Sequence, residues 1–199
     1  MMEKEIAKAL EVLRAGGILL YPTDTVWGLG CDATNPEAVA KIYQIKHRAD
    51  SKSLVLLASD MDMIAKYVQD IPEMAIQLVE VNDKPMTIIY PGARAAAEGE
   101  PACKQLLAHN VIAEDGTVGI RIPMMEFCQK LVYKLGRPLV STSANISGEV
   151  TPGSYNEISS EIKDQVDYCV DSTLGIHATG KSSSIIKVGL DSSIEIIRK

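Results

Sequence analysis

The sequence predicts an α/β fold formed by a single domain. Short apolar runs typical of strands alternate along the chain with segments whose apolar residues recur every three or four positions, as on the buried face of a helix. The chain has 199 residues, of which 46% are hydrophobic, so it can bury one sizeable core. No repeat, low-complexity tract or linker interrupts it, which favours one domain over residues 1–199.

The predicted elements of the N-terminal half are bounded by glycine, proline and capping residues. Gly16 ends the first helix, and Pro22, which has no N–H group for a ladder, ends the strand that follows. Asn35 is a favourable N-cap, and Pro72 divides a longer segment into two short helices. In order, we expect a helix over 3–15, a strand over 18–21, a helix over 35–46, a strand over 54–58, two helices within 61–81 and a strand over 86–90.

Similar signals bound the elements of the C-terminal half. Gly136 ends a helix with one apolar face, and Ser154 with Glu157 forms a capping box at the start of another. A turn around Gly189 separates two apolar runs and predicts a β-hairpin. In order, we expect a short helix over 101–109, a strand over 117–123, a helix over 124–135, a strand over 138–141, a helix over 154–163, a strand over 166–170 and a hairpin of strands 184–188 and 194–198.

Composition argues against several classes of protein. No apolar stretch reaches the ~18 residues of a membrane helix and the N-terminus is charged, so we expect no membrane contact and a cytoplasmic location. The four cysteines and three histidines lack zinc-binding spacing, which predicts free thiols and no protein-bound metal. A net charge of −6 argues against a surface that binds nucleic acid over its whole area, although it permits a local basic cleft.

The loop after the first strand is the first candidate site. Residues 22–30 combine threonines, an aspartate and glycines at a strand end, where hydroxyls and free N–H groups suit a small polar ligand. An ordinary surface turn has a similar composition. Trp27, the only Trp, favours the ligand hypothesis and is expected to form a cleft wall.

Two further polar segments are candidates. Lys46, Arg48 and Lys52 lie at the end of a predicted helix and in the loop that leads back to the sheet, at an edge where α/β proteins bind anions. Complementing the helix dipole would explain the first two cations but not Lys52. The hydroxyls and amide of residues 141–148 offer many hydrogen-bonding groups, although an ordinary Ser/Asn/Gly turn is the alternative.

One motif indicates a different function. Gly175 to Ser182 matches the P-loop pattern of nucleotide-binding proteins letter for letter. A P-loop requires that a helix begin at its Lys-Ser pair, so that free N–H groups cradle phosphate. Here Ile185 and Ile186 follow, which is strand composition, so a P-loop NTPase is the less favoured hypothesis.

Five separated motifs resemble the YrdC/TsaC family, the threonylcarbamoyl-AMP synthases. They run in the family's order from Gly16 to Arg198, with Trp27 where the family usually has Tyr and Asn82-Asp83-Lys84-Pro85 in place of Trp-Pro-Gly-Pro. A sister branch without demonstrated synthase activity typically lacks the Ser143-Ala144-Asn145 element that is intact here. The motifs are Tyr21-Pro-Thr-Asp-Thr-Val-Trp-Gly-Leu-Gly30, Lys46-x-Arg48 with Lys52, Thr117-Val-Gly-Ile-Arg121, Ser141-Thr-Ser-Ala-Asn145-Ile-Ser-Gly148 and Ser183-Ser184-Ile-Ile.

The resemblance implies a twisted, largely parallel mixed sheet flanked by helices around a positively charged cavity. It also implies a nucleotidyltransferase reaction in which L-threonine, bicarbonate and ATP, the last carrying Mg²⁺, give threonylcarbamoyl-AMP and pyrophosphate. The product would pass to a threonylcarbamoyl transferase complex that modifies tRNA. The competing hypothesis is a double-stranded RNA-binding or ribosome-maturation factor of the same fold, because a basic cavity would also attract an RNA backbone.

The resemblance also assigns roles to individual residues. Lys46 and Arg48 would be catalytic, stabilising charge on the transferring phosphoryl group. L-Threonine would be held by Thr25, Arg121, Ser143, Ser183 and Ser184, with Arg121 pairing the carboxylate. ATP would be held by Arg48, Lys52, Thr117, Ser141, Asn145 and Arg198.

Overall fold

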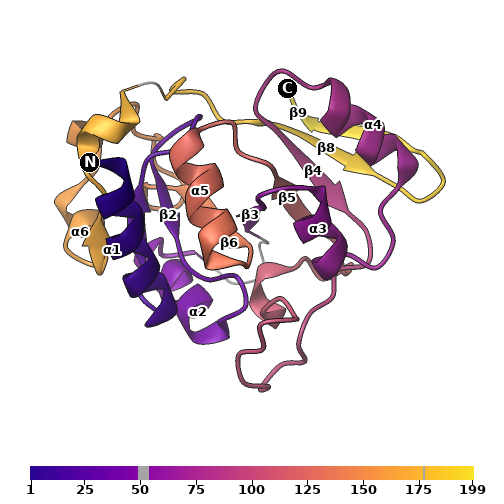
Figure 1. The fold of residues 1–199 in the computed structure, drawn as a ribbon, viewed down its shortest axis with the longest axis horizontal. Coiled ribbons are helices and arrows are strands. Elements are labelled where there is room, and N and C mark those ends of the chain that lie inside the picture. Colours follow the sequence, from indigo (N-terminus) through magenta and orange to yellow (C-terminus); the bar gives the residue numbers. More distant parts are fainter. Residues whose placement is uncertain (49–53, 177) are drawn as a thin grey trace.

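The computed structural model describes residues 1–48, 54–176 and 178–199. Within these residues the chain forms one mixed nine-stranded sheet, ordered β7-β1-β2-β6-β3-β5-β4-β8-β9 and flanked by helices (Figure 1). The strands are β1 (Leu19–Tyr21), β2 (Gly28–Gly30), β3 (Val55–Leu57), β4 (Met86–Tyr90), β5 (Val118–Arg121), β6 (Leu139–Ser143), β7 (Tyr168–Cys169), β8 (Ser184–Val188) and β9 (Ile194–Arg198). The helices are α1 (Met2–Arg14), α2 (Pro36–Ile45), α3 (Met61–Tyr67), α4 (Glu73–Val81), α5 (Glu126–Leu135) and α6 (Ser160–Lys163), with 3₁₀ turns η1 (His109–Val111), η2 (Tyr155–Glu157) and η3 (Ser172–Gly175).

The expectation of an α/β domain with a mixed, helix-flanked sheet is confirmed, but the sheet is not largely parallel. Among the described strands, three pairings are parallel (β1 with β7, β3 with β5, β4 with β8) and five are antiparallel. Parallel neighbours need a crossover of a dozen or more residues, whereas the six residues between β1 and β2 allow only an antiparallel return. Short connections thus explain the antiparallel pairings of β1 with β2 and of β8 with β9, whereas the other three antiparallel pairs join strands distant in the sequence.

Strand β2 lies where the sequence predicted a loop. Gly28 to Gly30 pairs antiparallel with β1 and with β6, and all three residues are buried. A glycine-rich run has low strand propensity. It pairs here because the absence of side chains lets the Tyr21 ring and the Val140 carbonyl approach, so that a Cβ on Gly30 would lie 2.6 Å from atoms of both.

Two predicted helices differ from the structure. Residues 101–109 form turns and the start of η1, because the N–H groups of Leu107 and Ala108 donate to the carbonyls of Arg94 and Ala33 instead of bonding along a helix. The predicted helix over 154–163 divides into η2 and α6, and α6 begins only after Ser159, whose side chain accepts a bond from Ile162 N. Ser154 Oγ donates to the Glu157 carboxylate, but the Ser154 side chain accepts no bond from the turn, so the predicted capping box does not form and the helical turn ends there.

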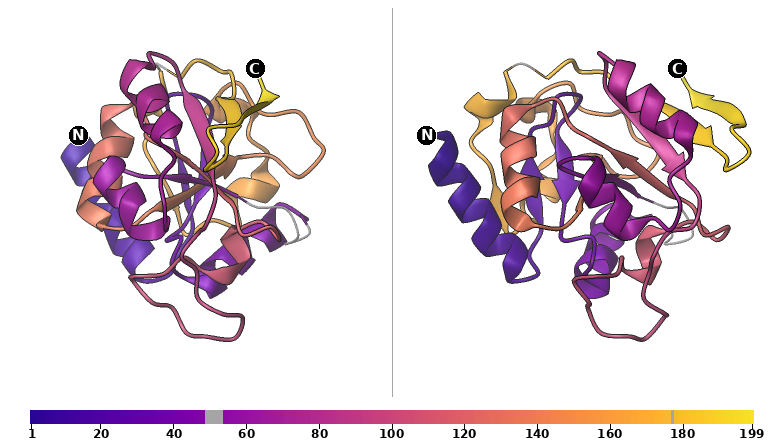
Figure 2. Two further views of the ribbon diagram at one scale, coloured as in Figure 1. Left: turned by 90° about the vertical axis from the view of Figure 1, so that its right-hand side faces the viewer. Right: turned by 45° about the vertical axis from the view of Figure 1, so that its right-hand side comes forward.

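The two faces of the sheet are different. Helices α1, α5, α3 and α4 cover one face, which is in front in Figure 1 and is seen edge-on in the left view of Figure 2. Ile88, Ile120 and Val140 point to this side and are buried in the core. Side chains point alternately to the two faces, so the residues between them point away from the helices. These are Thr87, Ile89, Val55, Gly119, Arg121, Ser141, Ser143, Ile185 and Lys187, and all of them line one cavity.

Candidate functional site

The cavity on the open face of the sheet has a volume of about 880 Å³, within the usual range for small-molecule sites. Segments from Thr23 to Arg198 line it, and Gly119 in its floor adds no side chain. Eight of the residues predicted to bind substrate come together here: Thr25, Arg48, Thr117, Arg121, Ser141, Ser143, Ser183 and Arg198.

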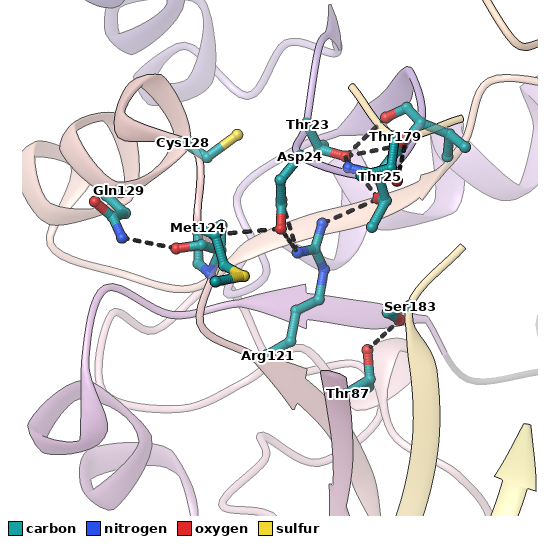
Figure 3. Close-up of polar contacts among 12 residues, drawn as sticks. Thr23, Asp24, Thr25, Thr87, Arg121, Met124, Cys128, Gln129, Thr179 and Ser183 are labelled. Carbon is teal, nitrogen blue, oxygen red and sulfur yellow. Dashed lines mark hydrogen bonds and ion pairs between the residues drawn. The ribbon is translucent and has the colours of Figure 1, made fainter. Parts of the chain in front are cut away.

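Arg121 is held by the first loop (Figure 3). Its Nη1 donates to both carboxylate oxygens of Asp24, at 2.8 and 2.9 Å, and its Nη2 donates to Thr25 Oγ1 at 3.2 Å. The arginine side chain is 3% exposed and that of the aspartate 10%. Asp24 also accepts from the N–H of Met124, which fixes the carboxylate. The pairing therefore compensates a buried guanidinium and leaves Nη2 turned toward Thr25 at the cavity wall.

The hydroxyl of Thr23 organises the same loop. Its Oγ1 donates to Val26 O at 2.8 Å and accepts from the N–H of Thr25. Thr23 Oγ1 also lies 2.8 Å from Thr25 Oγ1. Because each hydroxyl has one proton, the Thr25 hydroxyl donates to Thr23. Thr25 Oγ1 is then an acceptor for Arg121 and for one further donor in the cavity.

Lys46 lies behind the cavity and does not line it. Its Nζ donates to the carbonyls of Ser143 and Asn145, at 2.5 and 2.6 Å, and the residue is 2% exposed. Burial, together with the charge of Arg48, lowers the pKa of the ammonium to about 8. The structure therefore gives Lys46 contacts that hold the 143–145 loop against α2.

Three other predicted residues are not among those lining the cavity. Asn145 donates its amide to the carbonyls of Ile146 and Glu149. Ser184 belongs to β8, where strand alternation places it opposite Ile185 and Lys187, which do line the cavity. Lys52 lies outside the described residues.

The far wall is built by the C-terminal hairpin. Thr87 and Ser183 share a buried hydrogen bond of 2.8 Å, and Arg198 Nε donates to the carbonyl of Ser183. Burial lowers the pKa of Arg198. Lys187 pairs with Asp115, and this contact, with a bond from Thr117, lowers the pKa of the Asp115 carboxyl to about 2. The Thr117 hydroxyl thus already donates to the Asp115 carboxylate at the rim of the cavity.

Charge in the cavity is mixed. Arg48, Arg121, Lys187 and Arg198 line it together with the acidic Glu114, Asp115 and Glu195. Burial also lowers the pKa of Arg48. The positively charged cavity expected from the resemblance stays a prediction, because Lys52 is outside the described residues. In the part of the chain that the structure describes, no group of three His, Cys, Asp or Glu side chains is placed to hold a metal, and no helix is long and apolar enough to cross a membrane.

Trp27 does not form a cleft wall, as the sequence suggested. It is 2% exposed, its ring lies 5.1 Å from that of Tyr155, and Gly175 packs against it so closely that a Cβ there would come within 2.8 Å. The large ring fills the space between the first loop and the segments around Tyr155 and Gly175. Burial of its apolar area stabilises the loop from behind.

The P-loop hypothesis is wrong. The N–H groups of Thr179 and Gly180 donate to the carbonyls of Asp24 and Thr25, so they are not free to cradle phosphate. Strand β8 begins at Ser184 where a P-loop needs a helix. Residues 178–180 form a strap that bonds to the first loop.

Sequence reasoning missed the structural partners of the predicted residues. Asp24 stood in the first motif without a role, and Thr87, Asp115 and Lys187 carried no signal beyond their place in or beside a strand. A carboxylate between two threonines, in a chain with only two arginines on predicted strands, Arg121 and Arg198, could have indicated that one of them is its partner.

Comparisons with known proteins identify the family of the chain. Residues 11–199 match the family model Sua5_yciO_yrdC, described as "Telomere recombination". A threonylcarbamoyl-AMP synthase of Pseudoalteromonas translucida is 35% identical over 175 residues, covering 87% of this chain and 88% of that protein. Another, from Vibrio campbellii, is 28% identical over 166 residues, covering 82% and 84%.

Two solved structures share the fold. Sua5 of P. abyssi complexed with L-threonine has a TM-score of 0.76 and 26% identity, over 92% of this chain and 50% of that one. E. coli YciO has a TM-score of 0.75 and 25% identity, over 100% and 90%. The chain thus spans about half the length of the Sua5 chain and nearly all of YciO.

Proposed function

Because the chain belongs to the Sua5/YciO/YrdC family, we propose that it is a threonylcarbamoyl-AMP synthase. The observation that carries this proposal is one cavity that combines the Thr25–Arg121 pair and Ser143 with Arg48 and Arg198. The first group suits a small amino acid and the second suits phosphates. The threonine-bound Sua5 structure supports an amino-acid site in this fold.

We propose the following chemistry. The amine of L-threonine and bicarbonate give a carbamate and water. A carbamate oxygen then attacks the α-phosphorus of ATP, and pyrophosphate leaves, which makes the enzyme a nucleotidyltransferase. Such a transfer needs positioning and charge stabilisation rather than covalent work by the protein. Arg48 and Arg198, which both line the cavity, would supply the positive charge.

L-Threonine would sit beside the first loop. Thr25 Oγ1 has capacity for one more donor and suits the ammonium or hydroxyl group of the amino acid. Since Asp24 occupies Nη1 of Arg121, the substrate carboxylate would meet the guanidinium at Nη2. Lys46 would act through the loop that it holds, rather than by touching phosphate.

Mg²⁺ would arrive with ATP. The described acidic residues of the cavity do not form a three-ligand cluster, and Asp115 is already engaged by Lys187 and Thr117. Magnesium commonly binds through substrate phosphates and water with few protein ligands, which fits this lining. We also place the reaction in the cytoplasm, with the product passed to a threonylcarbamoyl transferase complex that acts on tRNA.

The test measures pyrophosphate release with ATP, bicarbonate and one amino acid at a time. A site that hydrogen-bonds the substrate hydroxyl leaves its own polar groups unpaired when that hydroxyl is missing. Serine, which lacks only a methyl group, should lose about 1 kcal/mol of binding, whereas valine should be much poorer. Equal release with serine, valine and no amino acid would show that the cavity does not read the side chain.

A further inference from the structure

A second concavity lies on the other side of the sheet, among the helices. It has a volume of about 710 Å³ and is bounded by the ends of α1, α3 and α5 and by the connection that follows β4. The ends of α5 and α3 that bound this concavity lie toward the viewer in Figure 1. Five cationic side chains line it, and we call it the basic hollow: Arg14, Lys66, Arg94, Lys104 and Arg137.

The charge of the basic hollow contrasts with the rest of the molecule. No aspartate or glutamate is among its described lining residues, whereas the cavity on the open face has three acidic residues beside four basic ones. The chain as a whole carries a formal charge of −6. Like charges gathered at one place repel each other, so such a cluster lowers the stability of the folded chain. A bound anion would remove this electrostatic repulsion.

The backbone that carries two of these cations is fixed by Tyr67. This residue is 2% exposed, and its hydroxyl donates to the carbonyl of Lys104 at 2.6 Å. Its own carbonyl accepts from the N–H of Arg94 at 2.8 Å, and Leu107 donates to Arg94 O at 2.9 Å. The cations of an otherwise irregular connection are thereby anchored to α3 and held at one concavity.

Helix dipoles account for part of the cluster. Three helices end here, and each C-terminus carries about half a negative charge. Arg14 Nη2 donates to Lys134 O near the end of α5, and Arg137 pairs with Asp32 at 2.5 Å. Together these offset about half of the five positive charges. Arg94 and Lys104 cap no helix, and neither forms an ion pair within the described residues.

We propose that the basic hollow binds a compact polyphosphate anion, either free pyrophosphate or the phosphate chain of a nucleotide. The cations converge on one concavity from four segments, which suits a small multivalent anion better than an extended backbone. The only lining aromatic residue, Tyr67, is buried, so no platform for stacking bases is present among the described lining residues. This site is separate from the proposed active site, which lies across the sheet.

The test compares two double variants in an Arg48→Ala background, which weakens phosphate binding in the cavity on the open face. Arg94→Ala/Lys104→Ala removes two charges from the basic hollow, and Lys41→Ala/Lys84→Ala removes two exposed charges elsewhere. Calorimetric titration with sodium pyrophosphate should show binding in the background. We expect Arg94→Ala/Lys104→Ala to weaken the affinity for pyrophosphate at least about tenfold. We expect Lys41→Ala/Lys84→Ala to leave this affinity within about twofold of the background. Melting temperatures check that each variant is folded.

A separate titration with ATP distinguishes the two sources of the anion. Tighter binding of ATP than of pyrophosphate indicates a nucleotide, and the reverse indicates free pyrophosphate. In an otherwise wild-type chain, Arg94→Ala/Lys104→Ala should keep pyrophosphate release with threonine within about twofold of wild type. The proposal is overturned if the Arg48→Ala protein binds no pyrophosphate, or if the two double variants made in it bind pyrophosphate with equal affinity. It is also overturned if an RNA duplex binds through Arg94 and Lys104 while pyrophosphate does not.

Discussion

At the scale of single residues, Asp24 decides how Arg121 is presented to the cavity. Both carboxylate oxygens bond to Nη1, in a pair that is almost completely buried. Removing one partner of such a pair leaves an uncompensated charge. The carboxylate is therefore a positioning group for the residue expected to meet the substrate carboxylate.

Asp24→Asn should raise the KM for L-threonine by about tenfold or more, because the guanidinium loses a fixed partner and its orientation. The KM for ATP should change little. Steady-state pyrophosphate release, with each substrate varied in turn, measures both. Asp60→Ala is the control: Asp60 caps α3 by accepting from Met63 N, and its loss should cost about 0.5–2 kcal/mol of stability without moving either KM. An unchanged threonine KM in Asp24→Asn would refute the positioning role.

Lys46 gives a prediction for the pH dependence of stability. Burial lowers its pKa from 10.5 to about 8. Between these values the unfolded chain binds a proton that the folded chain has released, so stability rises with pH relative to a variant without the amine. From pH 7 to 9.5, the wild type should gain up to about 2 kcal/mol over Lys46→Met. Urea unfolding of both proteins at both pH values measures this, and parallel curves would contradict it.

At the scale of elements, two strand glycines have opposite roles. A Cβ on Gly30 of β2 would lie 2.6 Å from the Tyr21 ring and from the Val140 carbonyl. A Cβ on Gly119 of β5 would lie no closer than 3.4 Å to its neighbours and would project into the cavity. The first glycine serves strand packing, and the second keeps the cavity floor open.

Gly30→Ala should therefore lower the free energy of unfolding by about 1–3 kcal/mol. Gly119→Ala should leave it within about 0.5 kcal/mol and instead weaken substrate binding. Chemical denaturation and steady-state kinetics on both variants test the pair, each serving as the other's control. A destabilised Gly119→Ala with normal KM values would show that the floor of the cavity is packed rather than open.

At the scale of the whole molecule, the cavity joins segments from both ends of the chain. Thr23 and Arg198 line the same space, and the strap at Thr179 and Gly180 bonds to the first loop. Unfolding must disassemble such a site, so ligands that bind only the folded chain stabilise all of it. A ligand that binds in this cavity should therefore raise the free energy of unfolding of the whole chain.

ATP and L-threonine at about 100 times their dissociation constants should each raise the free energy of unfolding by about 2.7 kcal/mol. Thermal unfolding with each ligand measures this. Arg48→Ala should lose much of the ATP effect while keeping that of threonine. No shift in the wild type, at concentrations that saturate turnover, would mean that the ligands do not bind the folded chain in preference to the unfolded chain.

The sequence alone determined most of the elements. The hairpin 184–188 and 194–198, the division of 61–81 at Pro72 and the helix stop at Gly136, which adopts φ 72°, all agree with the structure. Each depends on periodicity, capping or turn chemistry within a few residues. The family motifs also named eight of the residues that line the cavity.

The tertiary structure decided which groups meet. Strand β2, the antiparallel pairings and the burial of Trp27 depend on Tyr21, Val140, Tyr155 and Gly175, which no local window brings together. The pair of Asp24 with Arg121 joins positions 97 residues apart, and Lys46 reaches carbonyls 97 and 99 residues away. Local patterns record the conformation of one segment, but the direction of a strand and the partner of a buried charge are set by packing between distant segments.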